Sequence, residues 1–287
     1  MSTVSVLTLV HRRSRHLTNL LQGLRQSARL PDEVVIVYMN EPEDYKLPPL
    51  PYPVRTLHVR SETTNLPLAE ARNQAAAQAR HELLIFLDVD CIPETDLLAR
   101  YERAFSQFSG LLMGDVRYLP AQATAPDWSF PQLRSLAVRH PARPAIASLV
   151  QPEPRYELFW SLSFGIRRAT FDQLGGFDSG YQGYGAEDTD LAFTARQQRV
   201  LFALCSARAY HQHHAVYRPP VQHLGDIVAN ARYFRQKWQC WPMEGWLRAF
   251  QEARFVAWQP EGDQLEIIRN PSQDEIDQAY SDAPAGF

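Results

Sequence analysis

The stretch that most constrains the fold is Leu83 to Cys91, where five apolar residues run directly into two carboxylates. A short apolar run of this kind predicts a buried strand that reaches the edge of its sheet. Side chains alternate along a strand, so we expect Asp88 and Asp90 to point the same way. Two like charges held together there are costly without a cation. The pattern therefore predicts a divalent metal site and a phosphate-bearing substrate, with a helix N-cap or turn at Asp90 as the simpler alternative.

Apolar segments around this run alternate between strand and helix periodicity. We expect strands over residues 4–10, 34–39, 54–59 and 111–118, and helices over residues 17–24, 68–80 and 97–108. This alternation predicts an α/β fold with a doubly wound, mostly parallel sheet and helices on both faces. Ligands bind such sheets at the carboxyl ends of the strands, where the two aspartates fall.

The second half of the chain is less regular. Prolines recur through residues 120–154 and exclude long elements there, which predicts either a binding loop or a mobile surface excursion. Further on we expect strands over residues 157–166 and 200–204, helices over residues 187–198, 223–238 and 245–253, and a frayed tail after residue 261.

Composition excludes several classes of protein. With 29 basic and 32 acidic residues the net charge is −3, so nothing indicates a nucleic-acid surface. The three cysteines lack CxxC spacing, which argues against a disulfide framework or structural zinc and favours a reducing, cytoplasmic setting. No apolar run approaches the ~20 residues of a membrane span, so we expect no integral membrane segment. Peripheral membrane contact and the oligomeric state stay open.

A glycine-rich acidic segment follows, from the Gly175-Gly176 turn to the run Gly183-Tyr184-Gly185-Ala186-Glu187-Asp188-Thr189-Asp190. Glycines permit tight turns and close backbone approach to a ligand. Glu187 and Asp188 open a predicted helix, whose dipole favours their ionised forms. A carboxylate held ionised beside a cleft can act as a general base, although both residues could simply decorate the helix start. For Asp190 we favour a hydrogen-bonding role at the helix start.

Two further patterns carry chemistry. His211, His213 and His214 cluster after a predicted strand, and neutral imidazole is a common metal ligand, although a polar surface turn is the alternative. No HExxH motif accompanies them, which disfavours a zinc hydrolase. Arg72 lies in an alanine-rich helix before the acidic strand, where it can pair with a phosphate or carboxylate or be an ordinary surface arginine.

These segments, in this order, resemble family 2 glycosyltransferases with a GT-A fold. The second half resembles the catalytic region shared by β-1,4-galactosyltransferases and chondroitin-type polymerases. The resemblance covers about residues 4–214 and rests on Ala71-Arg72-Asn73, Phe86-Leu87-Asp88-Val89-Asp90, Gly175-Gly176-Phe177-Asp178 and Gly185-Ala186-Glu187-Asp188-Thr189-Asp190.

The resemblance implies a role for individual residues. Asp188 matches the catalytic base, and Glu187 its neighbouring acceptor-binding carboxylate. Asp90 and His211 match the ligands of a divalent metal, Mn²⁺ or Mg²⁺, with Asp88, His213 and His214 less favoured. Donor-binding residues are expected at Thr8, Val10, Arg12, Asn40, Leu68, Arg72, Asn73, Asp88, Val89 and Asp90. Acceptor-binding residues are expected at Trp160, Tyr184, Gly185 and Glu187.

The family often has an acidic residue after the second strand that contacts the base or ribose, where this chain has Asn40. The resemblance therefore specifies the identity of the nucleotide less firmly. The resemblance implies a metal-dependent, inverting transfer of a sugar from a nucleotide sugar, most simply a UDP-sugar, to a hydroxyl acceptor such as a saccharide. It implies a GT-A domain over residues 1–220, with a nucleotide-binding half (1–118) and an acceptor and catalytic half (119–220). Residues 221–287 are expected to form a helical C-terminal extension packed on this domain.

Two other functions share features of this sequence. A nucleotidyltransferase shares the fold class and the acidic metal ligands, but it usually has a glycine-rich loop after the first strand, and residues 11–15 contain no glycine. A non-catalytic carbohydrate-binding protein is disfavoured by the intact acidic groups. Release of a nucleoside diphosphate would distinguish a glycosyltransferase from both.

Overall fold

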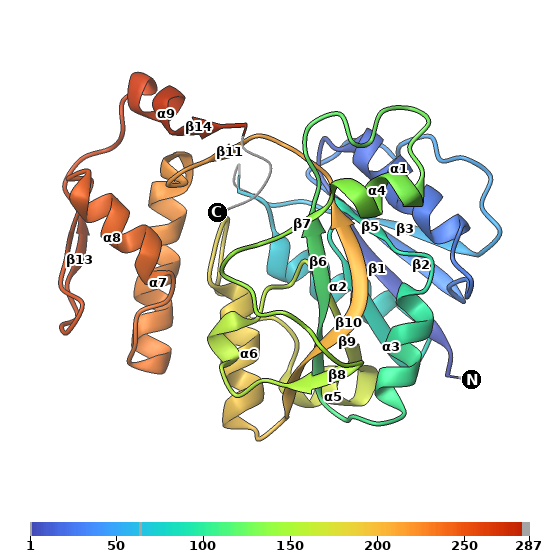
Figure 1. Cartoon of the computed structure of the whole chain (residues 1–287). Helices are drawn as coiled ribbons and strands as arrows, with labels where there is room; N and C mark the ends of the chain where they lie inside the picture. The colour runs from blue at the N-terminus through green and yellow to red at the C-terminus, as the bar shows by residue number, and fades with distance from the viewer. Residues whose placement is uncertain (1, 63–64, 283–287) are drawn as a thin grey trace.

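The computed structural model describes residues 2–62 and 65–282, and a mixed sheet forms its centre (Figure 1). Its strands are β1 (Val4–Val10), β2 (Glu33–Met39), β3 (Val54–Val59), β4 (Leu83–Leu87), β5 (Cys91–Pro93), β6 (Leu111–Tyr118), β7 (Val138–Arg139), β8 (Val150–Pro152), β9 (Ser163–Arg167) and β10 (Phe202–His211). Their order in the described residues is β3-β2-β1-β4-β9-β6-β10-β5, with β7 on β6 and β8 on β10.

The long strands of this sheet run in one direction. Strand β1 pairs in parallel with β2 and β4, β2 with β3, and β6 with β10. Strand β9 is antiparallel to both β4 and β6, so these two also run the same way. The expected α/β fold with a mostly parallel sheet is confirmed, and β9 is an antiparallel insertion at its middle.

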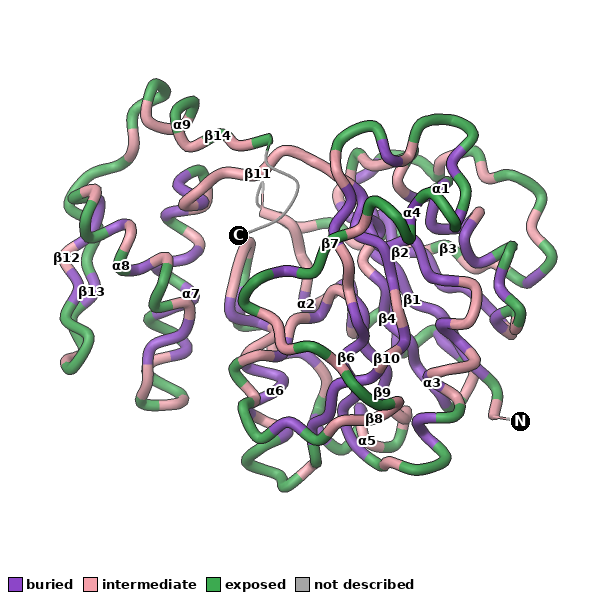
Figure 2. The backbone as a smooth tube through the Cα atoms, viewed as in Figure 1, coloured by how far each residue is buried: buried purple, intermediate pink, exposed green. Residues whose placement is uncertain are grey.

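Helices cover both faces of the sheet (Figure 1). On one face lie α1 (Ser14–Arg25) and α3 (Leu97–Phe105), and on the other lie α2 (Leu68–Gln78), α5 (Arg168–Leu174) and α6 (Glu187–Gln197). In α1 the buried leucines at 17, 20, 21 and 24 follow helical periodicity and pack on the sheet. Figure 2 shows the sheet strands buried between these two layers.

The C-terminal segments form a smaller unit beside α6, built from α7 (Leu224–Trp238), α8 (Glu244–Glu252), the hairpin β12 (Val256–Trp258) and β13 (Leu265–Ile267), and α9 (Gln273–Ala279). Strand β14 (Tyr280–Ser281) returns to pair with β11 (Val216–Tyr217). The expectation of a frayed tail is wrong up to residue 282, because Leu265 joins the core of this unit and Ile276 and Ala279 pack against it. Over the described ranges, no helix is both long and apolar enough to cross a bilayer.

Three local predictions differ from the structure. Residues 157–162 precede the strand rather than belong to it, since a 3₁₀ turn (Tyr156–Leu158) comes first. The proline-rich stretch contains α4 (Phe130–Leu136) and the short strands β7 and β8. Strand β10 continues beyond residue 204 to His211, because Arg208 pairs with Asp115 on neighbouring β6. This extension carries the histidine cluster to the edge of the sheet.

Candidate active site

The acidic motif occupies a turn, not a strand. Strand β4 ends at Leu87, and the Cys91 backbone N–H donates to the Asp88 carbonyl at 2.8 Å across the turn. The expectation that Asp88 and Asp90 share one face of a strand is therefore wrong. Because the chain turns here, Asp88 faces Arg72 on α2, while Asp90 faces Arg13 and the histidines.

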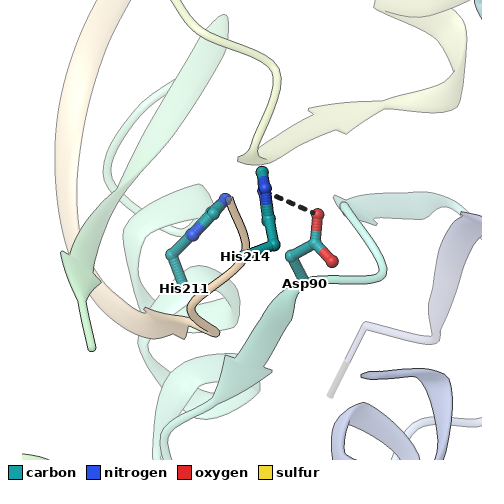
Figure 3. A group of neighbouring side chains, drawn as sticks. All are labelled: Asp90, His211 and His214. Carbon is teal, nitrogen blue, oxygen red and sulfur yellow. Dashed lines mark ion pairs between the residues drawn. The ribbon is translucent and has the colours of Figure 1, made fainter. Parts of the chain in front are cut away.

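Asp90, His211 and His214 form a candidate metal site (Figure 3). Antiparallel pairing sets His211 opposite Cys91, which brings the end of β10 beside Asp90. One potential ligand atom from each residue lies within 4.8 Å of the others. Among the described residues, the Oδ1 atom of Asp90 is buried without a hydrogen-bond partner, which fits a role as a metal ligand.

The electrostatics of this group suit a metal. Burial, together with the charge of Arg13, lowers the pKa of His211 well below its usual value and the pKa of His214 to about 4. Both imidazoles are therefore neutral at pH 7, as metal ligation requires. One carboxylate and two imidazoles form a donor set that fits a divalent transition metal. The Arg13 guanidinium contacts the Asp90 carboxylate directly.

The other candidate ligands lie apart from this group. His213 donates through Nε2 to the Asp282 carbonyl at 3.0 Å, if that nitrogen carries the proton. Asp88 is not among the three clustered residues. His214 was a less favoured candidate in the sequence. It lies beside Asp90 because β10 extends to His211 and so carries the residues that follow it to the acidic turn.

Arg72 joins the acidic turn to the distant helix α6. Its side chain is buried, and Nη1 donates to Glu187 Oε1 at 2.9 Å. Its Nη2 lies 3.6 Å from Asp88 Oδ1, and its guanidinium carbon lies 5.0 Å from the centre of the Phe177 ring. The surface-arginine alternative is therefore wrong. The charge of Arg72 is shared between two carboxylates from separate motifs.

The turn between α5 and α6 is fixed by Asn73. The amide of Asn73 donates to the Phe177 carbonyl and accepts from the Phe177 N–H, both at 2.8 Å. Gly175 and Gly176 adopt φ values of +81° and +73°, in the left-handed region that favours glycine. A Cβ on Gly176 would lie 2.6 Å from Asn73 Oδ1. Both polar atoms of Asn73 are thus engaged by the turn that leads to Glu187.

Asp188 lies in the first turn of α6 with a perturbed carboxyl group. The Thr189 N–H donates to its Oδ1 at 2.7 Å, and the Ser161 backbone also donates to it. Burial raises the pKa of Asp188 to about 7, with the charge of Glu187 adding to the rise and that of Arg72 opposing it. A carboxyl group with this pKa can accept a proton near neutral pH.

Asp190 connects α6 to the C-terminal unit. Its buried carboxylate accepts hydrogen bonds from the Tyr181 hydroxyl at 3.0 Å, Trp238 Nε1 at 2.7 Å and Lys237 Nζ at 2.9 Å. The expected bonds at the helix start are replaced by bonds to α7. Asp190 is therefore an anchor for the C-terminal helices.

Aromatic rings flank the acidic helix start on the expected acceptor side. The Tyr184 ring stacks on His223 at 4.6 Å and on Trp246 at 5.7 Å between ring centroids. Burial and the nearby carboxylates of Glu187 and Asp188 raise the pKa of the Tyr184 hydroxyl. Gly185 has a φ of +100°, and a Cβ there would lie 2.7 Å from the Met243 sulfur.

The remaining expected donor residues come from β1, the turn after β4, the start of α2 and the end of β2. Thr8 is buried and its hydroxyl has no hydrogen-bond partner among the described residues, whereas Val10 and Val89 pack in the core. Leu68 at the start of α2 is half-buried against the opposite core. Asn40 accepts from the Ser61 N–H at 2.8 Å. The side chain of Asn40 therefore holds the start of the segment that follows β3.

Sequence reasoning missed Glu41, the residue after Asn40. Its nearly buried carboxylate accepts from the Tyr45 hydroxyl at 2.6 Å and from the backbone N–H of Arg12, and His11 lies 3.5 Å away. Glu41 thus links the carboxyl ends of β1 and β2. The available signal was an acidic residue one position beyond the one that the family pattern indicated.

Comparisons with known proteins agree with this arrangement. Residues 5–118 match the model of glycosyl transferase family 2, and residues 143–223 match a model described as the N-terminal domain of galactosyltransferase. Among curated proteins, no sequence is a significant match.

Three solved structures resemble the fold at 16% sequence identity. TarS residues 1–349 from S. aureus align with 81% of this chain and 65% of their own, with a TM-score of 0.53. The mannosyltransferase PcManGT from Pyrobaculum calidifontis, in complex with GDP-Man and Mn²⁺, aligns over 82% of this chain and 63% of its own at 0.53. GalNAc-T7 with UDP, GalNAc and Mn²⁺ aligns over 74% and 43% at 0.52.

The sheet topology and these structural matches show a GT-A-type fold. Within it, a first segment similar to glycosyl transferase family 2 precedes a second segment similar to the galactosyltransferase domain. It spans less than two thirds of each of the three solved chains that it resembles.

Proposed function

We propose that the protein transfers a sugar from a nucleotide sugar to a hydroxyl group of a saccharide, with a divalent metal and with inversion at the anomeric carbon. The observation that supports this most directly is the Arg72 bridge between Asp88 and Glu187. It brings the acidic turn and the start of α6 to one edge of the sheet. A leaving-group site and a proton acceptor are then neighbours.

Asp188 is the proposed base. An acceptor hydroxyl must lose its proton as it attacks the anomeric carbon, and a single displacement needs one base near the attacking oxygen. Burial raises the pKa of Asp188 to about 7, which matches the proton transfer to neutral pH. Glu187 is held by Arg72 and orients the acceptor beside it.

Asp90, His211 and His214 would hold the metal. When bound, a divalent cation stabilises negative charge on a departing nucleoside diphosphate. Two imidazoles beside one carboxylate favour Mn²⁺ over Mg²⁺, since Mg²⁺ prefers oxygen ligands. The Mn²⁺ complexes of PcManGT and GalNAc-T7 support this choice.

The donor is proposed to be a UDP-sugar, with a GDP-sugar as the second compound to test. UDP and GDP-Man are bound in structures that share this fold. The acceptor is proposed to be a growing saccharide, which would place the enzyme in polysaccharide synthesis. The three cysteines are free thiols, which supports a reducing, cytoplasmic setting.

The experiment is a screen of UDP- and GDP-sugars for metal-dependent hydrolysis without an acceptor. We expect release of a nucleoside diphosphate from at least one donor with Mn²⁺, and none with EDTA. Release of pyrophosphate would instead indicate a nucleotidyltransferase. Saccharide binding without any donor turnover would indicate a carbohydrate-binding protein.

A further inference from the structure

An open hollow lies beneath the proline-rich segment that follows β7. The strands β6 and β10 form its floor, and its lining includes Asp115, Tyr118, Arg139, Arg143 and Trp160. None of the roles proposed above accounts for its charged residues.

Arg143 is an arginine without a carboxylate partner in this hollow. Its guanidinium carbon lies 3.1 Å from the centre of the Trp160 ring, and Nη1 donates to the Leu158 carbonyl at 2.8 Å. Its Nε is buried and has no hydrogen-bond partner in the part of the chain that the structure describes. Across residues 2–62 and 65–282, it forms no ion pair with an acidic side chain. A partly buried guanidinium left in this state retains donors for a ligand.

The charge of the hollow is positive. Asp115 is the only carboxylate among its lining residues, and it is compensated by Arg117 Nε at 2.9 Å and Arg208 Nε at 3.1 Å. Arg139 on exposed β7 adds a second cation to the lining. Burial lowers the pKa of Arg143 to about 10, so its side chain stays charged at neutral pH.

The hollow adjoins the proposed base. Trp160 and Leu162 line it, and the residue between them, Ser161, donates a backbone hydrogen bond to Asp188. The charges of Arg143 and Asp188 also interact. A ligand anchored at Arg143 would therefore extend toward the carboxylate that accepts the proton.

We infer that this hollow binds an anionic group of the acceptor saccharide, a carboxylate or a phosphate, with Arg143 as the residue that recognises it. The planar guanidinium fork matches both groups through paired hydrogen bonds. Trp160 holds the guanidinium plane in place, so little rotational freedom is lost on binding. The anion site follows from the hollow itself, and only the description of its ligand as an acceptor rests on the proposed function.

The test compares matched charged and neutral probes by NMR titration of the full chain. Methyl β-D-glucuronide is paired with methyl β-D-glucoside, and glucose 6-phosphate with glucose. We expect at least one anionic probe to bind roughly tenfold or more tightly than its neutral counterpart, the effect of one charge-assisted hydrogen bond. The pair that shows the preference distinguishes a carboxylate from a phosphate ligand.

Three variants connect this preference to the residue. Arg143→Gln should abolish it, Arg143→Lys should retain part of it, and Arg103→Gln should leave it intact, because Arg103 is an exposed arginine on α3 outside the hollow. Thermal unfolding checks that each variant is folded. If Arg143→Gln does not fold, the weakened preference expected of Arg143→Lys tests the role of Arg143 instead. Equal binding of charged and neutral probes by the wild type, or an undiminished preference in folded Arg143→Gln, would overturn the inference.

Donor hydrolysis by the wild-type protein is measured separately, because it tests the proposed function alone. Hydrolysis without any anion preference refutes only the anion site. An anion preference that depends on Arg143, without hydrolysis of any donor, supports the site and counts against sugar transfer.

Discussion

Arg72 on α2 donates a 2.9 Å hydrogen bond to Glu187 on α6, a residue 115 positions further along the chain. The same guanidinium lies 3.6 Å from Asp88 in the turn after β4. One buried cation thus balances two carboxylates that belong to different halves of the molecule. The acidic turn and the proposed base are positioned relative to each other through this side chain.

Removal of Arg72 should destabilise the protein strongly. Arg72→Ala leaves Asp88 and Glu187 as uncompensated carboxylates, and the loss of one partner of a buried ion pair typically costs about 3–5 kcal/mol. The free energy of unfolding in urea measures this cost. Arg103→Ala on the surface of α3 should change it by less than about 0.5 kcal/mol. Similar values for the two variants would contradict the bridging role.

The proposed base can be tested with Asp188→Asn. We expect kcat to fall by about 10²- to 10⁴-fold, the usual contribution of general base catalysis, while donor affinity is retained. Donor turnover and donor binding are measured on the same preparation. Asp172→Asn, an exposed carboxylate on α5, serves as the control and should retain full turnover. Unchanged turnover in Asp188→Asn would exclude this residue as the base.

The pH profile should report the same carboxyl group. Burial raises the pKa of Asp188 to about 7, so the group is protonated below this pH and ionised above it. Because a base acts only when ionised, kcat/KM should fall about tenfold per pH unit on the acidic side. The charge of Glu187 contributes to the raised pKa, so Glu187→Gln should move this limb to lower pH. A limb that stays in place in this variant would contradict the assignment.

The metal site predicts a distinction among three histidines. His211→Ala and His214→Ala should each weaken Mn²⁺-dependent donor binding by more than about tenfold, because even the loss of an outer-shell partner typically costs 10–100-fold in metal affinity. His213→Ala should have little effect, since His213 bonds the Asp282 carbonyl instead. Calorimetric titration of donor with and without Mn²⁺ measures the difference. Equal losses in all three variants would argue against the Asp90 cluster.

The glycine pair before α6 offers a matched test of packing. Gly175→Ala and Gly176→Ala both place an L-residue in the left-handed region, which costs about 1–2 kcal/mol. Only at position 176 does the new Cβ meet Asn73 Oδ1, at 2.6 Å, whereas position 175 has open space. We expect the free energy of unfolding of Gly176→Ala, measured by chemical denaturation, to be at least about 1 kcal/mol lower than that of Gly175→Ala. Equal free energies of unfolding for the two variants would mean that the Asn73 side chain moves aside at little cost, and would contradict its role in fixing the turn.

Local patterns predicted the elements of the first half closely. Residues 4–10, 54–59 and 111–118 form strands with the expected bounds. The signal is strongest for residues 4–10, where a mostly apolar run gives a fully buried strand, whereas residues 54–59 alternate between half-buried and exposed side chains. The antiparallel direction of β9 was not predicted, since an apolar run does not record which way its neighbours point. The length of β10 was also missed, because Arg208 in its middle is compensated only by Asp115 on another strand.

The candidate site was predictable in its residue types more than in its contacts. The acidic, glycine-rich and histidine motifs all lie near one edge of the sheet, yet the turn at Asp88 separates two carboxylates that the strand pattern places on one face. The partners Arg13 and Glu41 carry no local pattern. Their roles depend on strands that meet only in the folded chain.

The link from Asp190 to α7 joins catalysis to the stability of the C-terminal unit. Asp188 and Asp190 share the first turn of α6, and Asp190 is held by Lys237 and Trp238. When the C-terminal unit loosens, the start of α6 loses its outer support while the sheet remains intact. Heat should therefore inactivate the protein before it melts the central sheet, and ligands that tighten α7 should protect turnover from a distance.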